Sequence, residues 1–205
     1  MDPKAILATL SDGKGTLTGQ VFNPKSNGWD AALNGAYAYD PAKAKALLAQ
    51  AGAAQGFTMS MPVPVYPNLQ PLLTQQLAAV GIKINWVNVP NAQTNDQYLS
   101  GKFPVVWYQL QSSDPWQGIN FWGTRSAPWN PLHNDDPAID QQITAVQQSG
   151  AEPAELHRLA KLYIDKAWFV PAYFPDAVYF TSAKVDATPQ ALQIVPSIAN
   201  YKPAK

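Results

Sequence analysis

Hydrophobic positions recur along the chain with two periods, one typical of helices and one typical of strands. The helical period predicts helices over residues 3–10, 41–51 and 69–80, a weaker one over 92–100, and two more that begin at Pro137 and Pro153. The alternating period predicts strands over residues 57–65, 82–89, 104–110, 168–174 and 177–181. Because helices and strands alternate at roughly the spacing of βαβ units, the predicted fold class is α/β.

Two of the predicted helices follow the same dipeptide, an aspartate before a proline. Asp40-Pro41 and Asp136-Pro137 suit the capping and first helical positions, because the carboxylate can accept hydrogen bonds from free N–H groups and proline has no N–H to satisfy. The apolar residues that follow Pro137 and Pro153 share one face of each helix, and we expect them to be buried. They are Ile139, Ile143, Val146, Leu156, Leu159, Ala160 and Tyr163.

Three segments show neither period. Residues 11–39 are rich in Gly, Asn and Ser and are predicted to form a loop. Residues 112–135 combine aromatic residues with Pro and Asn and are predicted to be irregular. Residues 186–205 are polar, contain three prolines and are predicted to be extended. Residues 112–135 and the predicted strand before them, residues 104–110, hold most of the aromatic and amide side chains that are candidates for a binding site.

The composition excludes several classes of function. The 205 residues have a net charge of zero and only 14% charged residues, so no basic face is available for nucleic acid or for an anionic membrane. No hydrophobic run approaches the ~20 residues of a membrane-spanning helix. With no cysteine and only two histidines, His133 and His157, we predict neither a metal site nor a cofactor. Glycine-rich nucleotide motifs are also missing from the sequence.

The stretch WYQLQSSDPWQ, residues 107–117, is aromatic at both ends and polar in the middle. Alternation places Trp107, Gln109 and Gln111 on one face of the third predicted strand, with Tyr108 on the other. Ligands of open α/β sheets sit beyond the carboxyl ends of strands, where aromatic rings offer contact area and amides offer neutral hydrogen bonds. The predicted ligand-binding residues are Tyr108, Gln109, Gln111, Ser112, Trp116, Trp129 and Asn130.

Two other interpretations of this stretch stay open on the residues alone. The aromatic residues could belong to the core while the amides are simply solvated. Alternatively, Asp114 could serve a carbohydrate-active hydrolase with a Trp-lined cleft, but that chemistry needs two carboxylates, and the nearest candidates are Asp135 and Asp136 across a loop. Asp114 precedes a proline and also fits a turn, as Asp136 fits a helix cap. No catalytic residue is predicted on this basis.

Five segments, in order, resemble the extracytoplasmic solute-binding proteins of peptide/nickel-type ABC importers. They are YDPAKAKALLAQAG with GFTMSMPVPV, LTQQLAAVGIKINWVNV, KFPVVWYQLQSSDP, DDPAIDQQI and AWFVPAYFPDAVYF, and MDPKAI resembles the start of a further family helix. The similarity spans nearly the whole chain. It implies a ligand-binding protein without catalysis, outside the cytoplasm, that delivers a small molecule or peptide to a membrane permease.

The resemblance also implies an organisation that composition does not give. Members of the family are much longer, with two lobes around a ligand cleft. Residues 1–185 resemble the C-terminal lobe, of the type II periplasmic-binding-protein fold with a mixed sheet flanked by helices, and residues 186–205 resemble a tail that returns to the first lobe. Without that lobe, we expect exposed apolar surface and possible self-association.

Residues 107–117 depart from the peptide-binding pattern of the family. Peptide-binding relatives carry a Trp and, three residues on, an Asp that receives the ammonium group of the ligand. The matching positions in this chain are Tyr108 and Gln111. A neutral amide cannot make the charge-assisted hydrogen bond of a carboxylate, so the resemblance implies an uncharged ligand or a peptide held through its backbone.

Overall fold

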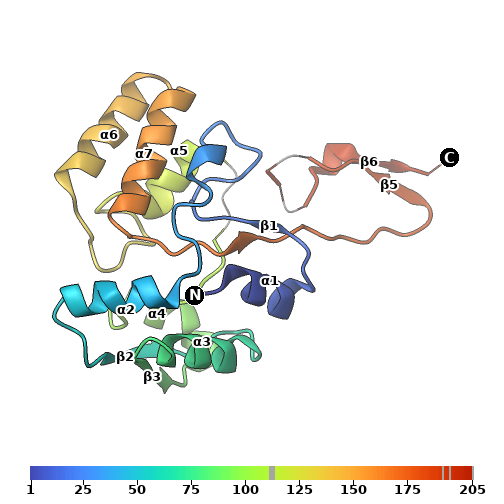
Figure 1. Ribbon diagram of the computed structural model, residues 1–205. Helices are drawn as coiled ribbons and strands as arrows, with labels where there is room; N and C mark the ends of the chain where they lie inside the picture. The colour runs from blue at the N-terminus through green and yellow to red at the C-terminus, as the bar shows by residue number, and fades with distance from the viewer. Residues whose placement is uncertain (111–113, 191, 194, 205) are drawn as a thin grey trace.

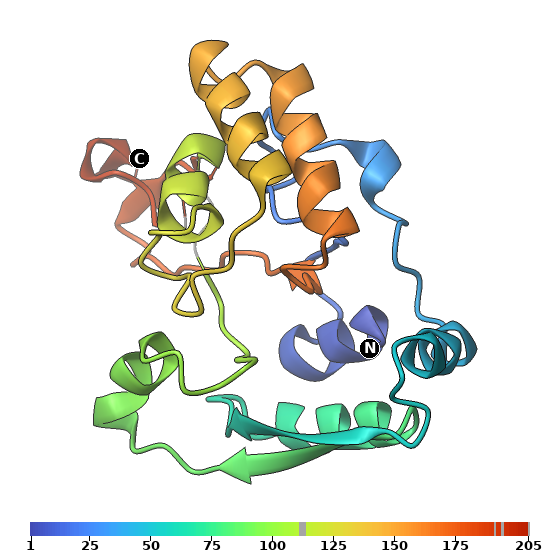
Figure 2. The same cartoon turned by 90° about the vertical axis from the view of Figure 1, so that its left-hand side faces the viewer.

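The computed structural model describes residues 1–110, 114–190, 192–193 and 195–204, and its elements fall into two groups with a C-terminal segment beside them (Figure 1). One group contains helices α5, α6 and α7, and the other contains α1, α3, α4 and the strands β2 and β3, with α2 at its side (Figures 1 and 2). The α-helices are α1 (Pro3–Ser11), α2 (Pro41–Gln50), α3 (Leu69–Ala78), α4 (Thr94–Leu99), α5 (Pro115–Gly118), α6 (Pro137–Gln148) and α7 (Pro153–Asp165).

Short helical turns and strands complete the described part of the chain. The turns are η1 (Ala31–Leu33), η2 (Asn91–Gln93), the π-helical turn η3 (Ile119–Gly123) and η4 (Ile198–Asn200). The strands are β1 (Thr16–Leu17), β2 (Phe57–Pro62), β3 (Ile82–Val87), β4 (Tyr173–Phe174), β5 (Val185–Ala187) and β6 (Tyr201–Pro203). The predicted mixture of helices and strands is therefore confirmed.

The β structure of the described residues is divided among three two-stranded sheets. Strands β2 and β3 are parallel, with Phe57 opposite Ile82, and α3 connects them. The pairs β1–β4 and β5–β6 are antiparallel. At the start of the parallel pair, Gly56 has φ +74°, and a Cβ there would come within 1.9 Å of the carbonyl oxygen of Gly81. Only glycine therefore allows the two strands to begin side by side.

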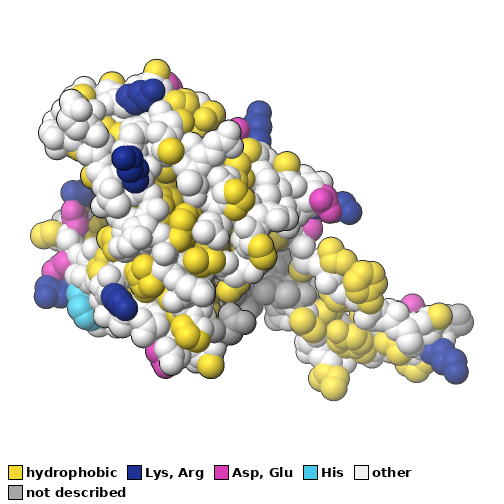
Figure 3. All heavy atoms as spheres, turned by 90° about the horizontal axis from the view of Figure 1, so that it is seen from below, with side chains coloured by type: hydrophobic (Ala, Val, Ile, Leu, Met, Phe, Trp, Pro, Cys, Tyr) yellow, Lys and Arg dark blue, Asp and Glu magenta, His cyan; other side chains and the backbone are white. Residues whose placement is uncertain are grey.

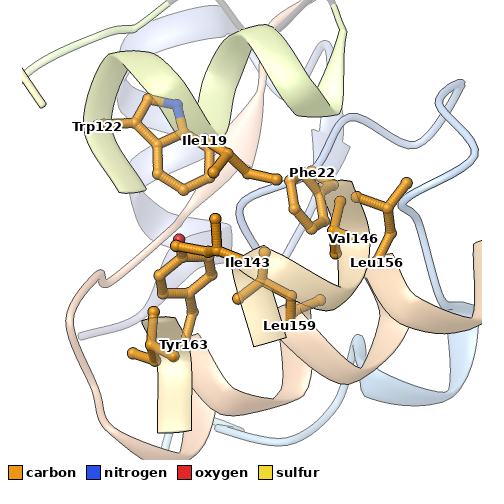
Figure 4. Packing of buried hydrophobic residues seen from close by; sticks show 10 residues of the cluster. Phe22, Ile119, Trp122, Ile143, Val146, Leu156, Leu159 and Tyr163 are labelled. Carbon is orange, nitrogen blue, oxygen red and sulfur yellow. The ribbon is translucent and has the colours of Figure 1, made fainter. Parts of the chain in front are cut away.

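The first core lies between the α6–α7 pair and the α5–η3 segment, and most of its side chains are drawn in Figure 4. All seven apolar residues predicted to face inward on α6 and α7 are buried, as expected. Phe22, Ile119 and Trp122 complete the cluster from outside the two helices. The hydroxyl of Tyr163 donates to the carbonyl oxygen of Gly123 at 2.9 Å, which ties α7 to η3.

The second core is smaller and lies between α1, α3 and β2. Its buried members are Ile6, Met61, Leu69, Leu73 and Ala172. Because Ile6 and Ala172 are far apart in the sequence, this core forms only when the segment after α7 reaches α1.

Several predicted strands are shorter than expected or are not formed. The second strand ends at Val87, and the predicted strand over 168–174 is reduced to Tyr173–Phe174. The predictions of strands over 104–110 and 177–181 are wrong for this structure, because neither range belongs to a described ladder. Alternation in the sequence indicates an extended backbone, but a strand also requires a neighbouring strand to pair with.

The predicted loops contain more regular structure than the sequence indicated. Residues 11–39 include β1 and η1, and the segment predicted as irregular over 112–135 includes α5 and η3. Residues 112 and 113 of this segment are outside the described part of the chain. Short helical turns in both segments were missed because they have too few residues to display a period.

Residues 177–190, 192–193 and 195–204 form the C-terminal extension, which projects away from both groups and contains β5, η4 and β6 (Figure 1). In place of a wholly extended tail, the described residues form the short antiparallel pair β5–β6 and the turn η4. Hydrophobic side chains gather on its surface (Figure 3). The most exposed are Phe180 at 93% and Ile198 at 90% of their full accessibility.

Candidate functional site

A broad cleft of about 1320 Å³ lies beside both cores. Its lining includes residues 103–110 and 166–177, two segments without much regular structure that connect the two groups of elements. Side chains from both core clusters, among them Met61 and Trp122, also line the cleft. The cleft therefore lies where the chain passes from one core to the other.

Four aromatic rings form a continuous chain of contacts, and three of the rings line this cleft. The Tyr108 and Trp129 rings lie with centroids 4.2 Å apart, Tyr98 meets Tyr108 edge-on at 5.6 Å, and Phe121 lies 6.0 Å from Trp129. Tyr98, Tyr108 and Trp129 line the cleft, and Tyr108 is 38% exposed. We refer to these four residues as the aromatic stack.

Neutral hydroxyl–amide pairs lie beside the aromatic stack. The hydroxyl of Tyr66 donates to Oε1 of Gln109 at 2.7 Å, and the hydroxyl of Tyr108 donates to Oδ1 of Asn95 at 3.0 Å. Gln109 is exposed and lines the cleft together with Tyr66. Tyr66, Tyr108 and Gln109 thus bring uncharged polar groups to the lining of the cleft.

Asn130 lines the cleft but uses its amide within its own loop. Its Nδ2 donates to the carbonyl oxygens of Thr124 and Asn134, both at 2.9 Å, and its Oδ1 accepts from the backbone N–H of Asn134 at 3.0 Å. The side chain is 5% exposed. These bonds fix the loop that carries Trp129, so the observed contribution of Asn130 is to position the aromatic stack.

The remaining predicted site residues lie elsewhere or outside the described range. Trp116 is half-buried and packs against the first core. Gln111 and Ser112 fall in residues 111–113, which the structure does not describe. Of the seven predicted residues, Tyr108, Gln109, Trp129 and Asn130 are brought together at the cleft. Their role in ligand binding stays a prediction.

Sequence reasoning missed Tyr66 and Tyr98 as members of this site. Tyr66 follows β2, and Tyr98 lies on α4, so neither is near residues 107–117 in the chain. Burial raises the pKa of the Tyr98 hydroxyl, as does the neighbouring Tyr108, so this ring stays neutral at ordinary pH. The available signal was that both residues are aromatic, and an aromatic residue does not by itself distinguish a site from a core.

The charged residues among the described cleft lining are Lys25, Lys166 and Asp176, all from segments other than the aromatic stack. Lys166 is also paired, because its Nζ lies 2.6 Å from Oδ2 of Asp136. The hydrogen bond from Lys166 holds the pKa of the Asp136 carboxyl below its ordinary value, and the backbone N–H of Ala138 also donates to that carboxylate. Asp136 therefore caps α6 as predicted and anchors the segment after α7.

Asp114, the candidate acid of the hydrolase interpretation, caps α5. It is exposed, and its Oδ1 accepts from the backbone N–H of Gln117 at 3.0 Å. Asp135, one of its proposed partners, pairs instead with Arg125 at 2.6 Å. Both carboxylates have structural roles, so nothing in this geometry supports the hydrolase. The described residues also contain no cluster of three or more His, Asp or Glu side chains suited to a metal ion.

The helical group and the α/β group, with the open cleft beside them, have the fold of the type II periplasmic binding proteins, as the following structures show. Over residues 1–130, the chain matches the family model described as the middle region of the bacterial extracellular solute-binding proteins, family 5. The chain therefore belongs to the bacterial extracellular solute-binding proteins of family 5. A comparison with curated protein sequences finds no relative.

Solved structures with the same fold are much longer than this chain. The ABC transporter substrate-binding protein CtaP from Listeria monocytogenes aligns with a TM-score of 0.80 at 15% identity, over 100% of this chain and 45% of that one. DppA from Helicobacter pylori, solved with the peptide STSA, aligns with a TM-score of 0.74 at 19% identity, over 85% of this chain and 36% of that one. AgaA from A. tumefaciens R10, solved with agropinic acid, aligns with a TM-score of 0.73 at 21% identity, over 84% of this chain and 38% of that one. The chain spans less than half the length of these three structures.

Proposed function

We propose that the chain is the C-terminal ligand-binding lobe of an ABC-importer substrate-binding protein, and that it contributes one wall of the cleft that captures a small polar solute. The observation that carries the proposal is the aromatic stack with its neutral hydroxyl–amide pairs on an open cleft of about 1320 Å³. Family membership and the ligand-bound structures of the same fold add support, since peptide and agropinic acid are the ligands of those proteins.

The extended segment over residues 104–110 supplies a second contribution to this wall. It lines the cleft, and no described ladder uses its backbone. An extended backbone with unused N–H and C=O groups can hold a peptide-like ligand by main-chain hydrogen bonds, while neighbouring side chains set the specificity. Binding in this function involves no catalytic step.

A first lobe would complete the cleft and pack against the C-terminal extension. The exposed Phe180 and Ile198 side chains of the extension support such a contact, because apolar groups of this size are normally covered. Closure of the two lobes would then present a surface to a membrane permease. We place this function outside the cytoplasm, in line with the extracellular family. No helix in the described ranges is long and apolar enough to cross a membrane.

Ligand-observed NMR on the 205-residue chain tests this function. With half of the contacts missing, we expect millimolar binding of at least one solute class from a panel of peptides, oligosaccharides and amino-acid conjugates. Tyr108→Ala should weaken that binding at least about tenfold, because it removes the central ring of the aromatic stack. Tyr39→Ala, which removes an exposed tyrosine before α2, is the matched control and should leave binding unchanged. Absence of binding for every class would overturn the proposal.

A further inference from the structure

The aromatic stack joins the helical group (α5, η3, α6 and α7) to the α/β group (α1, α3, α4, β2 and β3). Its rings come from α4, from the segment over residues 104–110, from η3 and from the loop that precedes α6. We infer that the stack, together with the contact of Gly101 with Pro131, is a clasp that holds the two groups together beside the cleft. When the clasp opens, the groups separate about the β1–β4 pair and both cores stay folded.

Outside the clasp, the two groups are connected mainly by irregular backbone. Among the described elements, α6 packs on α7 and α5 on η3, while α1, α3, β2 and β3 pack on one another. Residues 34–40, 104–110 and 166–172 pass between the groups, and the described structure has no helix or ladder in these ranges (Figure 2). A further crossing, from α1 to the region of Phe22, contains β1, which pairs with β4. Loop segments of this kind can absorb a rotation, and the β1–β4 pair can serve as its pivot.

On the side of the α/β group, the clasp begins at α4. Tyr98 is only 3% exposed although it belongs to neither core cluster, and its ring meets the Tyr108 ring edge-on at 5.6 Å. The Tyr108 hydroxyl also donates to Oδ1 of Asn95 on α4. After α4, Gly101 has φ +69°, and a Cβ there would lie 2.9 Å from the carbonyl oxygen of Pro131. The backbone after α4 therefore lies directly against the loop that reaches down from the helical group (Figure 2).

On the side of the helical group, Trp129 is held to the first core. Its backbone N–H donates to the carbonyl oxygen of Phe121 at 3.0 Å, and η3 is tied to α7 by the hydrogen bond from Tyr163 to Gly123. The Trp129 and Tyr108 ring centroids are 4.2 Å apart, so each ring covers part of the other. A continuous path of contacts therefore runs from α7 through η3, Trp129 and Tyr108 to α4.

The clasp is suited to opening and closing. Each aromatic pair contributes a modest free energy, and Tyr98, Tyr108 and Phe121 are outside both core clusters. Separating the rings therefore leaves the cores intact, as in the local openings of other proteins. The cleft is lined from both groups, by Met61 on one side and Trp122 on the other, so separation of the groups widens it. The clasp thereby regulates entry to the cleft, and only this consequence rests on the function proposed above.

Distances between spin labels on the 205-residue chain test the clasp. Because the chain has no cysteine, labels attach only where one is introduced. Gln75→Cys on α3 and Gln147→Cys on α6 replace exposed side chains and report on the separation of the two groups. By double electron–electron resonance, we expect one narrow distance distribution for this pair. In Trp129→Ala, the distribution should become at least about twofold broader and extend to longer distances, because flexible links then join the groups.

Two controls distinguish opening of the clasp from unfolding. Ala138→Cys and Ala154→Cys, at opposite ends of the α6–α7 hairpin, should keep their distance in Trp129→Ala, since the helical group stays folded. Phe180→Ala removes an exposed ring from the C-terminal extension and should change neither distance. Trp129→Phe keeps a ring at the clasp and should restore most of the narrow α3–α6 distribution.

A double variant tests whether the rings act as one unit. Tyr108 lies between Tyr98 and Trp129 in the path of contacts. Tyr98→Ala should therefore broaden the α3–α6 distribution as much as Trp129→Ala does, and the double variant should broaden it no further. Additive broadening, no change in either single variant, or a changed distance within the α6–α7 hairpin would overturn the clasp. These measurements involve no ligand, so their failure leaves the proposed function intact, and absence of binding in the solute panel leaves the clasp intact.

Discussion

The α6–α7 pair and the C-terminal extension contain apolar side chains of similar size in opposite surroundings. On the two helices, residues such as Leu156 and Leu159 have no exposed surface, and their contacts come from neighbouring helices and Phe22. In the extension, Phe180 and Ile198 are almost fully exposed. The comparison indicates that the helical pair is stabilised by this chain alone, whereas the extension presents a surface suited to a partner.

Substitution in the first core should have the largest effect. Leu159→Ala removes a fully buried side chain and leaves a cavity, so we expect the free energy of unfolding to fall by about 2–5 kcal/mol in urea denaturation. Leu47→Ala on α2, where the leucine is 51% exposed, is the matched control and should change it by less than about 0.5 kcal/mol. Equal losses for the two variants would contradict the description of α6–α7 as the stable part of the molecule.

The ion pair between Asp136 and Lys166 should make a smaller, pH-dependent contribution to stability in the same region. Asp136→Asn keeps a good capping side chain but loses the ion pair with Lys166, so Tm should fall by about 1–3 °C at pH 7. Because Lys166 lowers the folded-state pKa of Asp136, this contribution is present above the ordinary carboxyl pKa and is lost as the pH falls through the lowered value. The Tm values of the unchanged chain and of Asp136→Asn, measured by thermal melts, should therefore become equal in strong acid.

A charge-matched substitution in the extension serves as the control for this pH dependence. Asp186→Asn, in β5, removes an exposed carboxylate and should leave Tm unchanged at pH 7. If the Tm difference between Asp136→Asn and the unchanged chain persisted down to pH 2, the ion pair with Lys166 would not be the cause of that difference.

The smallest effect on stability is expected in the extension itself. Phe180→Ala removes a side chain that is 93% exposed, so Tm should change by less than about 1 °C. The same substitution should reduce self-association of the chain, measured as sedimentation at several concentrations, because it removes apolar surface that a second copy can cover. A large fall in Tm would mean that Phe180 is buried in solution. If Phe180→Ala left self-association unchanged, the exposed Phe180 side chain would not be part of the contact between copies.

The sequence predicted the helices well because helix signals are local. Asp40 and Asp136 cap helices that begin at the next residue, and the inward faces of α6 and α7 follow from spacing alone. Residues 104–110 were predicted as a strand because alternation is also local, yet strand pairing depends on a distant partner. The same limit applies to the site, where Tyr66 and Tyr98 reach Gln109 and Tyr108 only through the fold.

The second core joins segments that are far apart in the sequence, and this has a consequence for the order of folding. The hydroxyl of Ser11 donates to that of Tyr173 across 162 residues, and β1 pairs with β4 beside it. Closing so long a loop costs entropy that local contacts must offset first, so the α6–α7 hairpin and the β2–α3–β3 unit should form early and the β1–β4 contact late. A chain still being synthesised therefore cannot complete the second core until Ala172 has emerged, whereas most of the first core can assemble earlier.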